Sequence, residues 1–230
     1  MKIFCLLFLI CFCIFPSNGH AFIVDTDKIY TYKALTEDIL ELSKLYPGLI
    51  TYKSITTTPF GRNVWAIKVG NGETTILLNG AHHSREWLTT ALLMKMIESY
   101  ADFYPNVETV DDVHPSILDK VSIWFVPMVN PDGVLLQQFG LNAYPIGFHP
   151  FLIEMNEGSW DFNRWKANLF GMDLNRQYPA NWSYLKGVKT KPSYQFYKGN
   201  CPLEAPEVKA LVDFTYEVNP EIAINFVGVL

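Results

Sequence analysis

The first apolar positions after residue 30 repeat with the period of an α-helix. They are Leu35, Ile39, Leu42 and Leu45. We expect Thr36 to cap the N-terminus of this helix, with Glu37 and Asp38 in its first turn, where the helix dipole favours acidic side chains. Pro47-Gly48 predicts the end of the helix.

Two strand-like stretches follow this helix. Residues 49–56 and 64–69 alternate between apolar and polar positions and are rich in β-branched residues. Pro59-Phe60-Gly61 lies between them and has the composition of a tight turn. The three segments together predict an antiparallel hairpin.

A strand, a helix and a second strand come next along the chain. Residues 75–79 and 121–126 are almost continuously apolar, which is typical of strands buried on both faces. The sequence from Trp87 to about Tyr100 is helical in pattern and apolar on more than one side, so we expect it to be deeply packed. This βαβ unit and the hairpin predict an α/β fold with a mixed, mainly parallel central sheet flanked by helices.

The second half of the chain has less periodicity. From Gly133 to Leu203 we expect mostly loops, and so long a stretch within one domain usually builds a functional site. Pro206 opens a further helix, and Ile222–Val227 has the pattern of another buried strand. No repeat, linker or charge run divides the sequence, so we predict a single domain.

The N-terminal segment has the pattern of a secretory signal peptide. Lys2 precedes the apolar run Ile3–Phe15, and a short polar stretch then ends in Ala21. The run is shorter than the roughly 20 residues that cross a bilayer as a helix, so we expect no membrane span. We predict cleavage after Ala21, secretion, and a mature chain of residues 22–230.

Composition narrows the function classes. The chain has 230 residues, a net charge of −5 and a sequence pI of about 5.5, which argues against a general nucleic-acid-binding surface. Of its four cysteines only Cys201 follows the predicted leader, so the mature chain has no internal disulfide. We expect Cys201 to be a small buried residue.

One polar motif stands where chemistry is expected. Residues 79–87 follow a predicted buried strand, and ligands of open α/β sheets bind at the carboxyl ends of strands. His83 and Glu86 are three positions apart, which places an imidazole and a carboxylate on one side of a helical turn. Zinc prefers such nitrogen and oxygen ligands. The alternative is that Glu86 only favours a helix N-terminus while His83 hydrogen-bonds in a turn.

The order of three motifs favours the zinc interpretation. His83-Ser84-Arg85-Glu86-Trp87, then Asn130-Pro131-Asp132-Gly133, then Asp173-Leu174-Asn175-Arg176 together resemble the M14 family of zinc metallocarboxypeptidases. The loop Asn163–Asn168 and the tract Lys198–Val208 look most like the branch that contains bacterial γ-D-glutamyl-diaminopimelate peptidases. The resemblance covers nearly the whole chain after the leader.

The resemblance implies a role for each matching residue at the metal. His83 and Glu86 match the first two zinc ligands of the family. Asp173 matches the acid that hydrogen-bonds the ligand histidine and fixes its tautomer. We interpret His82 as a neighbour of the site, and His114 and His149 as solvated loop residues.

The resemblance also implies substrate contacts. Asn175 and Arg176 match the pair that holds the terminal carboxylate of the substrate, and a guanidinium can grip a carboxylate through two parallel hydrogen bonds. Arg85 matches a residue that contacts substrate further from the cleaved bond. For the arginine that polarises the carbonyl we favour Arg164, although spacing to the third motif points to Lys166.

The sequence departs from the family at its C-terminal end. The third zinc ligand of the family is a histidine, and Val227 occupies that position here. The general-base glutamate and the mobile tyrosine of the family come later than Leu230. We therefore expect residues 22–230 to be a partial M14 domain that lacks its C-terminal third, with an incomplete one-zinc site and little or no activity.

Three functions stay open on this evidence. The first is zinc-dependent hydrolysis of a C-terminal peptide bond by metal-activated water, and the second is cleavage of γ-D-glutamyl-diaminopimelate peptides of peptidoglycan. The third is a non-catalytic secreted protein that binds peptides. In each case the partner is a peptide or a peptidoglycan peptide, and we expect the folded chain to be a monomer.

Overall fold

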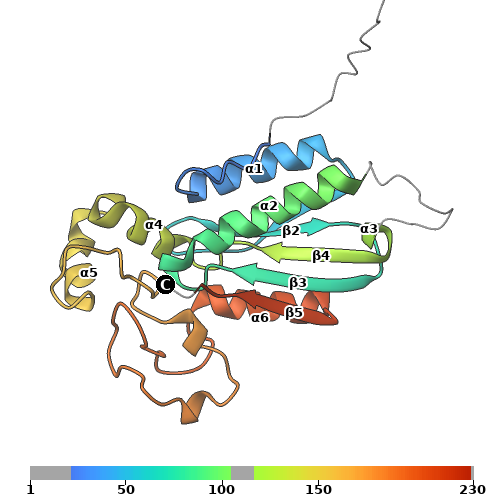
Figure 1. Ribbon diagram of the computed structural model, residues 1–230. Helices are drawn as coiled ribbons and strands as arrows, with labels where there is room; N and C mark the ends of the chain where they lie inside the picture. The colour runs from blue at the N-terminus through green and yellow to red at the C-terminus, as the bar shows by residue number, and fades with distance from the viewer. Residues whose placement is uncertain (1–21, 105–116, 229–230) are drawn as a thin grey trace, which may run out of the picture.

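A mixed five-stranded sheet forms the centre of the fold (Figure 1). The computed structural model describes residues 22–104 and 117–228. Its strands are β1 (Ile50–Thr57), β2 (Asn63–Val69), β3 (Thr74–Gly80), β4 (Val121–Val126) and β5 (Ile222–Phe226), in the order β1-β2-β4-β3-β5. The β1–β2 and β2–β4 pairs are antiparallel, whereas β3 pairs in parallel with both β4 and β5. The predicted mixed α/β class, hairpin and βαβ unit are confirmed.

Helices cover both faces of the sheet (Figure 1). They are α1 (Tyr32–Leu45), α2 (Leu88–Phe103), α3 (Ile117–Lys120), α4 (Pro131–Phe139), α5 (His149–Met155) and α6 (Pro206–Val218). Helices α1 and α2 share one apolar core with the sheet, and α6 packs into a second core on the opposite face. A third cluster joins α4, α5 and the loop that contains Trp165. This third cluster lies beyond the strand ends and supports the loops that follow β4.

The first helix begins five residues earlier than our predicted cap implies. Its N-cap is Thr31, whose hydroxyl accepts a hydrogen bond from the Ala34 amide at 3.1 Å. Thr36 lies inside the helix and donates to the Tyr32 carbonyl, so our assignment of Thr36 as the cap was wrong. Glu37 and Asp38 are consequently outside the first turn.

The stretch from Gly133 to Leu203 holds more helix than we expected. Asn130 caps α4 by accepting from the Gly133 amide at 3.0 Å, and Pro131 occupies the first turn, where it needs no donor. The short helix α5 follows at His149–Met155. Helices of nine and seven residues carry too few turns for their periodicity to stand out in the sequence.

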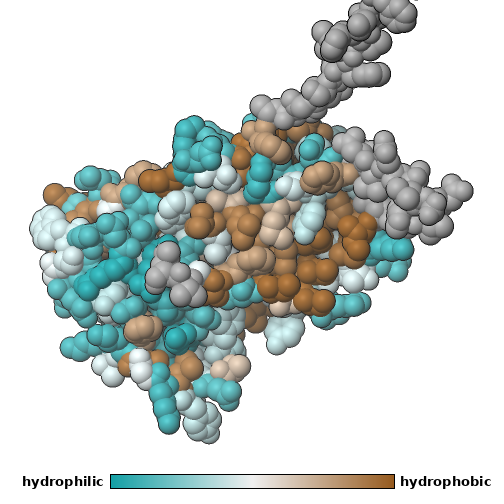
Figure 2. Space-filling view, viewed as in Figure 1, coloured by the Kyte–Doolittle hydropathy of each residue, from teal (hydrophilic) through white to brown (hydrophobic). Residues whose placement is uncertain are grey.

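Strand β5 is present as predicted, but it is not buried. All five of its residues are exposed or half-exposed, because β5 has a neighbour on one side alone among the described residues. Ile222 and Ile224 are 53% and 45% exposed, and Val227 beyond them is 47% exposed. Figure 2 shows apolar side chains gathered over this part of the molecule and α2.

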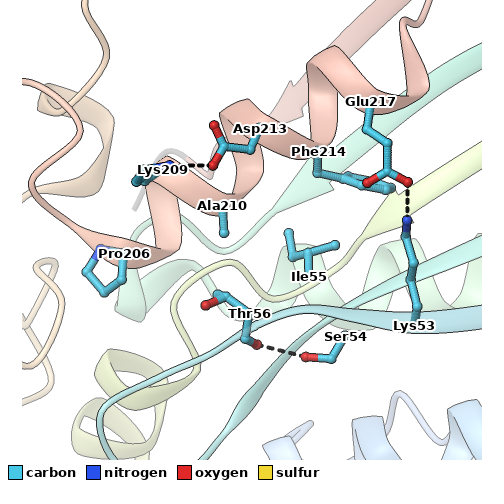
Figure 3. Close-up of a pocket in the computed structure, with 10 residues that line it drawn as sticks. All are labelled: Lys53, Ser54, Ile55, Thr56, Pro206, Lys209, Ala210, Asp213, Phe214 and Glu217. Atoms are coloured by element: carbon cyan, nitrogen blue, oxygen red, sulfur yellow. Dashed lines mark hydrogen bonds and ion pairs between the residues drawn. The ribbon is translucent and has the colours of Figure 1, made fainter.

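The edge strand at the other side of the sheet meets α6 across a polar groove (Figure 3). Lys53 of β1 pairs with Glu217 of α6, and its ammonium lies 5.0 Å from the centre of the Phe214 ring. Lys209 pairs with Asp213 at 2.6 Å within α6. Both lysines of the groove therefore have acidic partners, and these side chains line the space between α6 and β1.

Two sequence predictions fall on residues that the structure does not describe, and a third can be checked in the described part of the chain. The predicted signal peptide, residues 1–21, and His114 lie outside them. Within residues 22–104 and 117–228, no helix has the length and apolar character that a membrane span requires.

Candidate metal centre and substrate-binding loops

The turn after β3 is fixed by backbone hydrogen bonds to the segment after β4. The Val129 and Asn130 amides donate to the carbonyls of Gly80 and Ala81, each at 3.1 Å. Ala81 has a positive φ of 49°, and its amide donates to the Thr89 hydroxyl at 2.8 Å. The chain thus turns sharply at the strand end and starts the short helical turn Ser84–Glu86.

Asn130 joins this turn to the loop around residue 167. Its side-chain amide donates to the His82 carbonyl, the Ser84 hydroxyl and the Ala167 carbonyl, each at 3.1 Å. Asn130 is fully buried, so these bonds are shielded from water. Asn130 is therefore both the cap of α4 and the link between two loops.

His83, Glu86 and Asp173 meet at this end of the sheet. The Nδ1 atom of His83 lies 2.9 Å from Oε1 of Glu86, and its Nε2 atom lies 3.3 Å from Oδ1 of Asp173. The three residues are 3%, 5% and 0% exposed. The imidazole therefore faces one carboxylate with each ring nitrogen.

The fourth member of this cluster is Lys166. Its ammonium lies 2.8 Å from Oδ2 of Asp173 and 4.8 Å from the centre of the Phe196 ring, and the lysine is 6% exposed. Burial favours the neutral acid, but the His83 contact and the Lys166 charge outweigh it and hold the pKa of Asp173 well below its usual range. The carboxylate that faces His83 is therefore ionised.

Ionisation of His83 follows from the same contacts. Burial opposes its charged form, but the carboxylates of Asp173 and Glu86 outweigh burial and raise the pKa of His83 above its ordinary value. A metal ligand must be the neutral imidazole, so a cation between Nδ1 and Glu86 would replace the proton there. Nε2 would then stay protonated, and its N–H would be the hydrogen-bond donor that faces the Asp173 carboxylate.

Two residues of the cluster fit a zinc ion. His83 Nδ1 and the Glu86 carboxylate are the nitrogen and oxygen donors that zinc accepts, and Asp173 supplies the partner of the second ring nitrogen. Within the part of the chain that the structure describes, no group of three His, Cys, Asp or Glu side chains is arranged to hold a metal ion together. The Gly228 amide donates to the other Glu86 oxygen at 3.0 Å. Of the described residues, two fit as ligands.

Arg164, which we favoured as the carbonyl-polarising residue, points elsewhere. Its guanidinium donates to Asn156, at 2.7 Å to the carbonyl, and lies 3.5 Å from Glu157 and 4.0 Å from the centre of the Tyr194 ring. These contacts hold it outside the cluster of His83 and Asp173. Lys166, the other candidate, lies within that cluster.

Three further residues proposed to contact substrate are close to the cluster in sequence and half-buried. Asn175 and Arg176 form the short helical turn that directly follows Asp173, and Arg176 donates to the Asn175 carbonyl at 3.2 Å. Arg85 donates to the Arg164 carbonyl at 3.3 Å, and its Nε has no hydrogen-bond partner among the described residues. Both guanidinium groups thus keep donors that no described carboxylate occupies.

Three other expectations have structural answers. His149 is half-buried rather than solvated, and its Nε2 lies 2.9 Å from the Tyr144 carbonyl. Cys201 is exposed, so our expectation of a buried thiol was wrong. His82 is a neighbour of the cluster, and its Nε2 lies 2.5 Å from the Tyr178 hydroxyl.

Sequence reasoning left two contributors unassigned. The contact between His82 and Tyr178 joins residues 96 positions apart, and no local pattern signals it. Lys166 was named only through spacing, although a lysine between Trp165 and Ala167 in an apolar context was a signal of burial with a partner. Contacts between side chains far apart in the sequence could be identified only from the structure.

Comparisons with known proteins identify the family of the chain. The sequence profile of Peptidase_M14, described as zinc carboxypeptidase, matches residues 35–229. γ-D-Glutamyl-L-diamino acid endopeptidase 1 of Lysinibacillus sphaericus is 34% identical over 206 residues, which cover 86% of this chain and 50% of that protein. YqgT of Bacillus subtilis (strain 168) is 32% identical over 203 residues, covering 86% and 53%. The chain spans about half the length of these curated relatives.

The fold has counterparts among solved structures. Bovine thrombin-activatable fibrinolysis inhibitor, in complex with tick carboxypeptidase inhibitor, superposes with a TM-score of 0.68 at 19% identity, over 87% of this chain and 60% of the other. This likeness supports the architecture of sheet and helices. Since the family profile matches most of its length, the chain belongs to the zinc carboxypeptidase family, peptidase M14.

Proposed function

We propose that this chain carries two of the three protein ligands of a zinc site for carboxypeptidase-type hydrolysis, together with the residues that bind the free carboxyl end of a peptide. The observation that supports it most is the convergence of His83 Nδ1 and Glu86 at 2.9 Å, with Asp173 behind the imidazole. When bound, zinc acidifies a water molecule and polarises a peptide carbonyl.

Each residue has a defined task in this proposal. His83 and Glu86 hold the metal, and Asp173 keeps the imidazole in the tautomer that leaves Nδ1 free. Arg176 binds the terminal carboxylate through its guanidinium, Asn175 orients it, and Arg85 contacts the substrate further from the cleaved bond. These assignments carry the family roles to the matching positions of this chain.

Lys166 is the cation that we assign to the cluster in place of Arg164. Its ammonium is 2.8 Å from Asp173 and buried, so it neutralises that carboxylate. Arg164 is held by Asn156 and Glu157 instead. We propose that Lys166 sets the charge around His83, and that Arg164 positions the loop by its contacts.

We propose that the 230-residue chain binds zinc weakly and hydrolyses peptides poorly. Catalytic zinc sites hold three protein ligands, and the described residues bring together two. Equilibrium dialysis followed by metal analysis tests the first part, and release of C-terminal residues from a peptide panel tests the second. Stoichiometric zinc retained through extensive dialysis, together with turnover, would overturn this proposal.

Carboxylate recognition can be tested without turnover. Peptides with a free carboxyl end should bind, and the same peptides with an amidated end should bind at least about tenfold more weakly, because a charge-assisted bidentate contact is lost. Replacing Arg176 with Lys should weaken the first class and leave the second unchanged. Equal binding of both classes would contradict the assignment.

A second candidate function is cleavage of peptidoglycan peptides. The Lysinibacillus sphaericus relative at 34% identity is named for γ-D-glutamyl-L-diamino acid substrates. We propose such peptides as an alternative ligand class, with Asn175 and Arg176 contacting a different carboxylate. Competition between a γ-D-glutamyl-diaminopimelate peptide and an ordinary peptide for the same site distinguishes the two.

We also propose that the protein is secreted as a monomer after removal of residues 1–21. The basis is the run Ile3–Phe15 with its small-residue end at Ala21. N-terminal sequencing of protein recovered from the medium should begin at Phe22, and light scattering should give the mass of one chain. Recovery of an intact N-terminus in membranes would contradict it.

A further inference from the structure

The segment before α1 is fixed to α2 through one buried carboxylate. The Ile23 amide donates to Oε1 of Glu98 at 2.5 Å, and the Val24 amide donates to the same oxygen at 3.4 Å. Glu98 is 4% exposed, and Val24 is 2% exposed within the apolar core that α1 and α2 share with the sheet. Two successive backbone N–H groups thus point at one carboxylate oxygen, an arrangement that favours a bound anion.

The other oxygen of this carboxylate is paired within α2. The Lys95 ammonium lies 2.8 Å from Oε2 of Glu98 and 3.2 Å from the centre of the Phe22 ring. Phe22 itself is 66% exposed. The first residue after the predicted leader is therefore held beside Glu98 and is also accessible to water.

Other ionisable groups near Glu98 come from α1 and its flanks. Tyr30, Asp38 and Tyr46 lie within range of the Glu98 charge, and Asp38 accepts from the Tyr30 hydroxyl at 2.5 Å. Burial raises the pKa of Asp38 to about 6, so Asp38 is ionised at pH 7 and above. Among these groups two carboxylates accompany the one ammonium of Lys95, so the region favours a further cation.

Removal of the leader would supply a cation at this place. Cleavage after Ala21 converts the Phe22 nitrogen from a peptide amide into an α-ammonium group. The backbone nitrogens of Phe22 and Ile23 are three bonds apart, so they are separated by no more than about 3.7 Å. The ammonium would therefore lie within about 6 Å of Oε1 of Glu98, a range in which an opposite charge stabilises the charged form.

We propose that Glu98 binds the α-ammonium group of Phe22 in the processed chain, so that leader removal adds an ion pair between the new N-terminus and α2. The precursor lacks this pair, because its Phe22 nitrogen is an uncharged amide. Cleavage therefore stabilises the packing of the first segment on α2, the helix that follows the turn ending in Glu86. The inference rests on the proposed removal of residues 1–21.

The pKa of the Phe22 α-amino group tests the pair. The protein is secreted from the 230-residue precursor, its first residue is sequenced, and acetylation of the α-amino group is followed against pH by mass spectrometry. We expect a pKa above the ordinary range of roughly 7.7–8.0, and acetylation near pH 7 at least about threefold slower than in Glu98→Gln. Glutamine keeps an acceptor for the Ile23 amide, and the exposed control Glu73→Gln should behave like the unaltered protein.

A glycine inserted between Ala21 and Phe22 gives a second test that leaves Glu98 unchanged. It moves the ammonium one residue away, so the midpoint of thermal unfolding near pH 7 should fall by about 2–4 °C. The pair stabilises the fold below the ordinary pKa of the amine and is lost as pH rises through the raised pKa, so this difference should vanish above about pH 10. In the Glu98→Gln protein the insertion should leave the midpoint unchanged.

The outcomes separate this pair from the cleavage on which it rests. A first residue other than Phe22 would overturn both. A chain that begins at Phe22 and has the same α-amino pKa in the unaltered and Glu98→Gln proteins would overturn the pair alone. If Glu98→Gln does not fold, the glycine insertion decides, and equal midpoints with and without the added glycine would overturn the pair.

Discussion

The turn after β3 and the neighbouring strand β5 are built in opposite ways. At the turn, His83, Glu86 and Asp173 are 3%, 5% and 0% exposed, and His83 contacts both carboxylates, whereas the apolar side chains of β5 are largely exposed to solvent. Strand β3, which leads into the turn, pairs with β5 in parallel over Ile76 to Gly80. The difference teaches that the proposed ligands are positioned mainly by buried polar contacts with loops beyond β3 and β4, while the segment after β5 adds one contact, from the Gly228 amide to Glu86.

The buried ion pair provides the largest expected effect. Replacing Lys166 with Met leaves the Asp173 carboxylate without its ammonium in a fully buried place, and we expect the free energy of unfolding to fall by about 3–5 kcal/mol. The surface control Lys209→Met breaks the pair with Asp213 and should cost less than about 1 kcal/mol. Urea denaturation measures both, and similar losses would contradict the contrast.

Asn130 should come second. Replacing it with Ala removes the cap of α4 and leaves the His82 carbonyl without the donor that Asn130 provides, so we expect a loss of about 3 kcal/mol. The exposed Asn142→Ala variant should change stability by less than about 0.5 kcal/mol. Thermal unfolding measures the stability of both variants. A loss of stability in Asn130→Ala as small as that of its control would contradict the role assigned to Asn130.

The strands and one helix could be predicted from sequence because their patterns are local. The hairpin of β1 and β2, the buried β3 and β4, and helix α6 each have a clear apolar period and are confirmed. Strand β5 has the same apolar pattern as a buried strand, yet its exposure depends on whether a neighbour covers it. Burial is a property of the assembled fold, which a local pattern does not report.

The candidate site divides in the same way. His83, Glu86 and Asp173 were placed by motif, and the structure brings them together. Arg164 and Lys166 are two positions apart, and only the fold shows that one faces Asn156 while the other faces Asp173. Contacts between segments far apart in the chain, such as those of Asn130, were beyond sequence reasoning.

Glu207 allows a pH test of the buried loops. This carboxyl group is 2% exposed at the start of α6, and burial raises its pKa to about 7 from an ordinary value of 4.5. The folded chain then binds more protons than the unfolded chain between these values, so its stability should fall by about 2 kcal/mol as pH rises from 4.5 to 7. Glu207→Gln should flatten that decline, and an unchanged slope of unfolding free energy against pH would refute it.

Strand β5 should show the smallest effect on stability. Ile224 is 45% exposed, so Ile224→Thr should change the free energy of unfolding by less than about 0.5 kcal/mol. The same change should reduce aggregation, because it interrupts an apolar edge strand. Static light scattering at increasing protein concentration measures this aggregation. Unchanged aggregation would show that β5 is not the surface through which the chains associate.

The central claim is that His83 and Glu86 are ligands of one zinc ion. Anomalous diffraction at the zinc edge, from crystals of the chain soaked in a zinc salt, tests it most directly. The account predicts a single strong peak within about 2.0–2.2 Å of His83 Nδ1 and a Glu86 oxygen, absent in His83→Ala crystals. Full soaking with no peak between these two side chains, or a peak that survives in the variant, would contradict it.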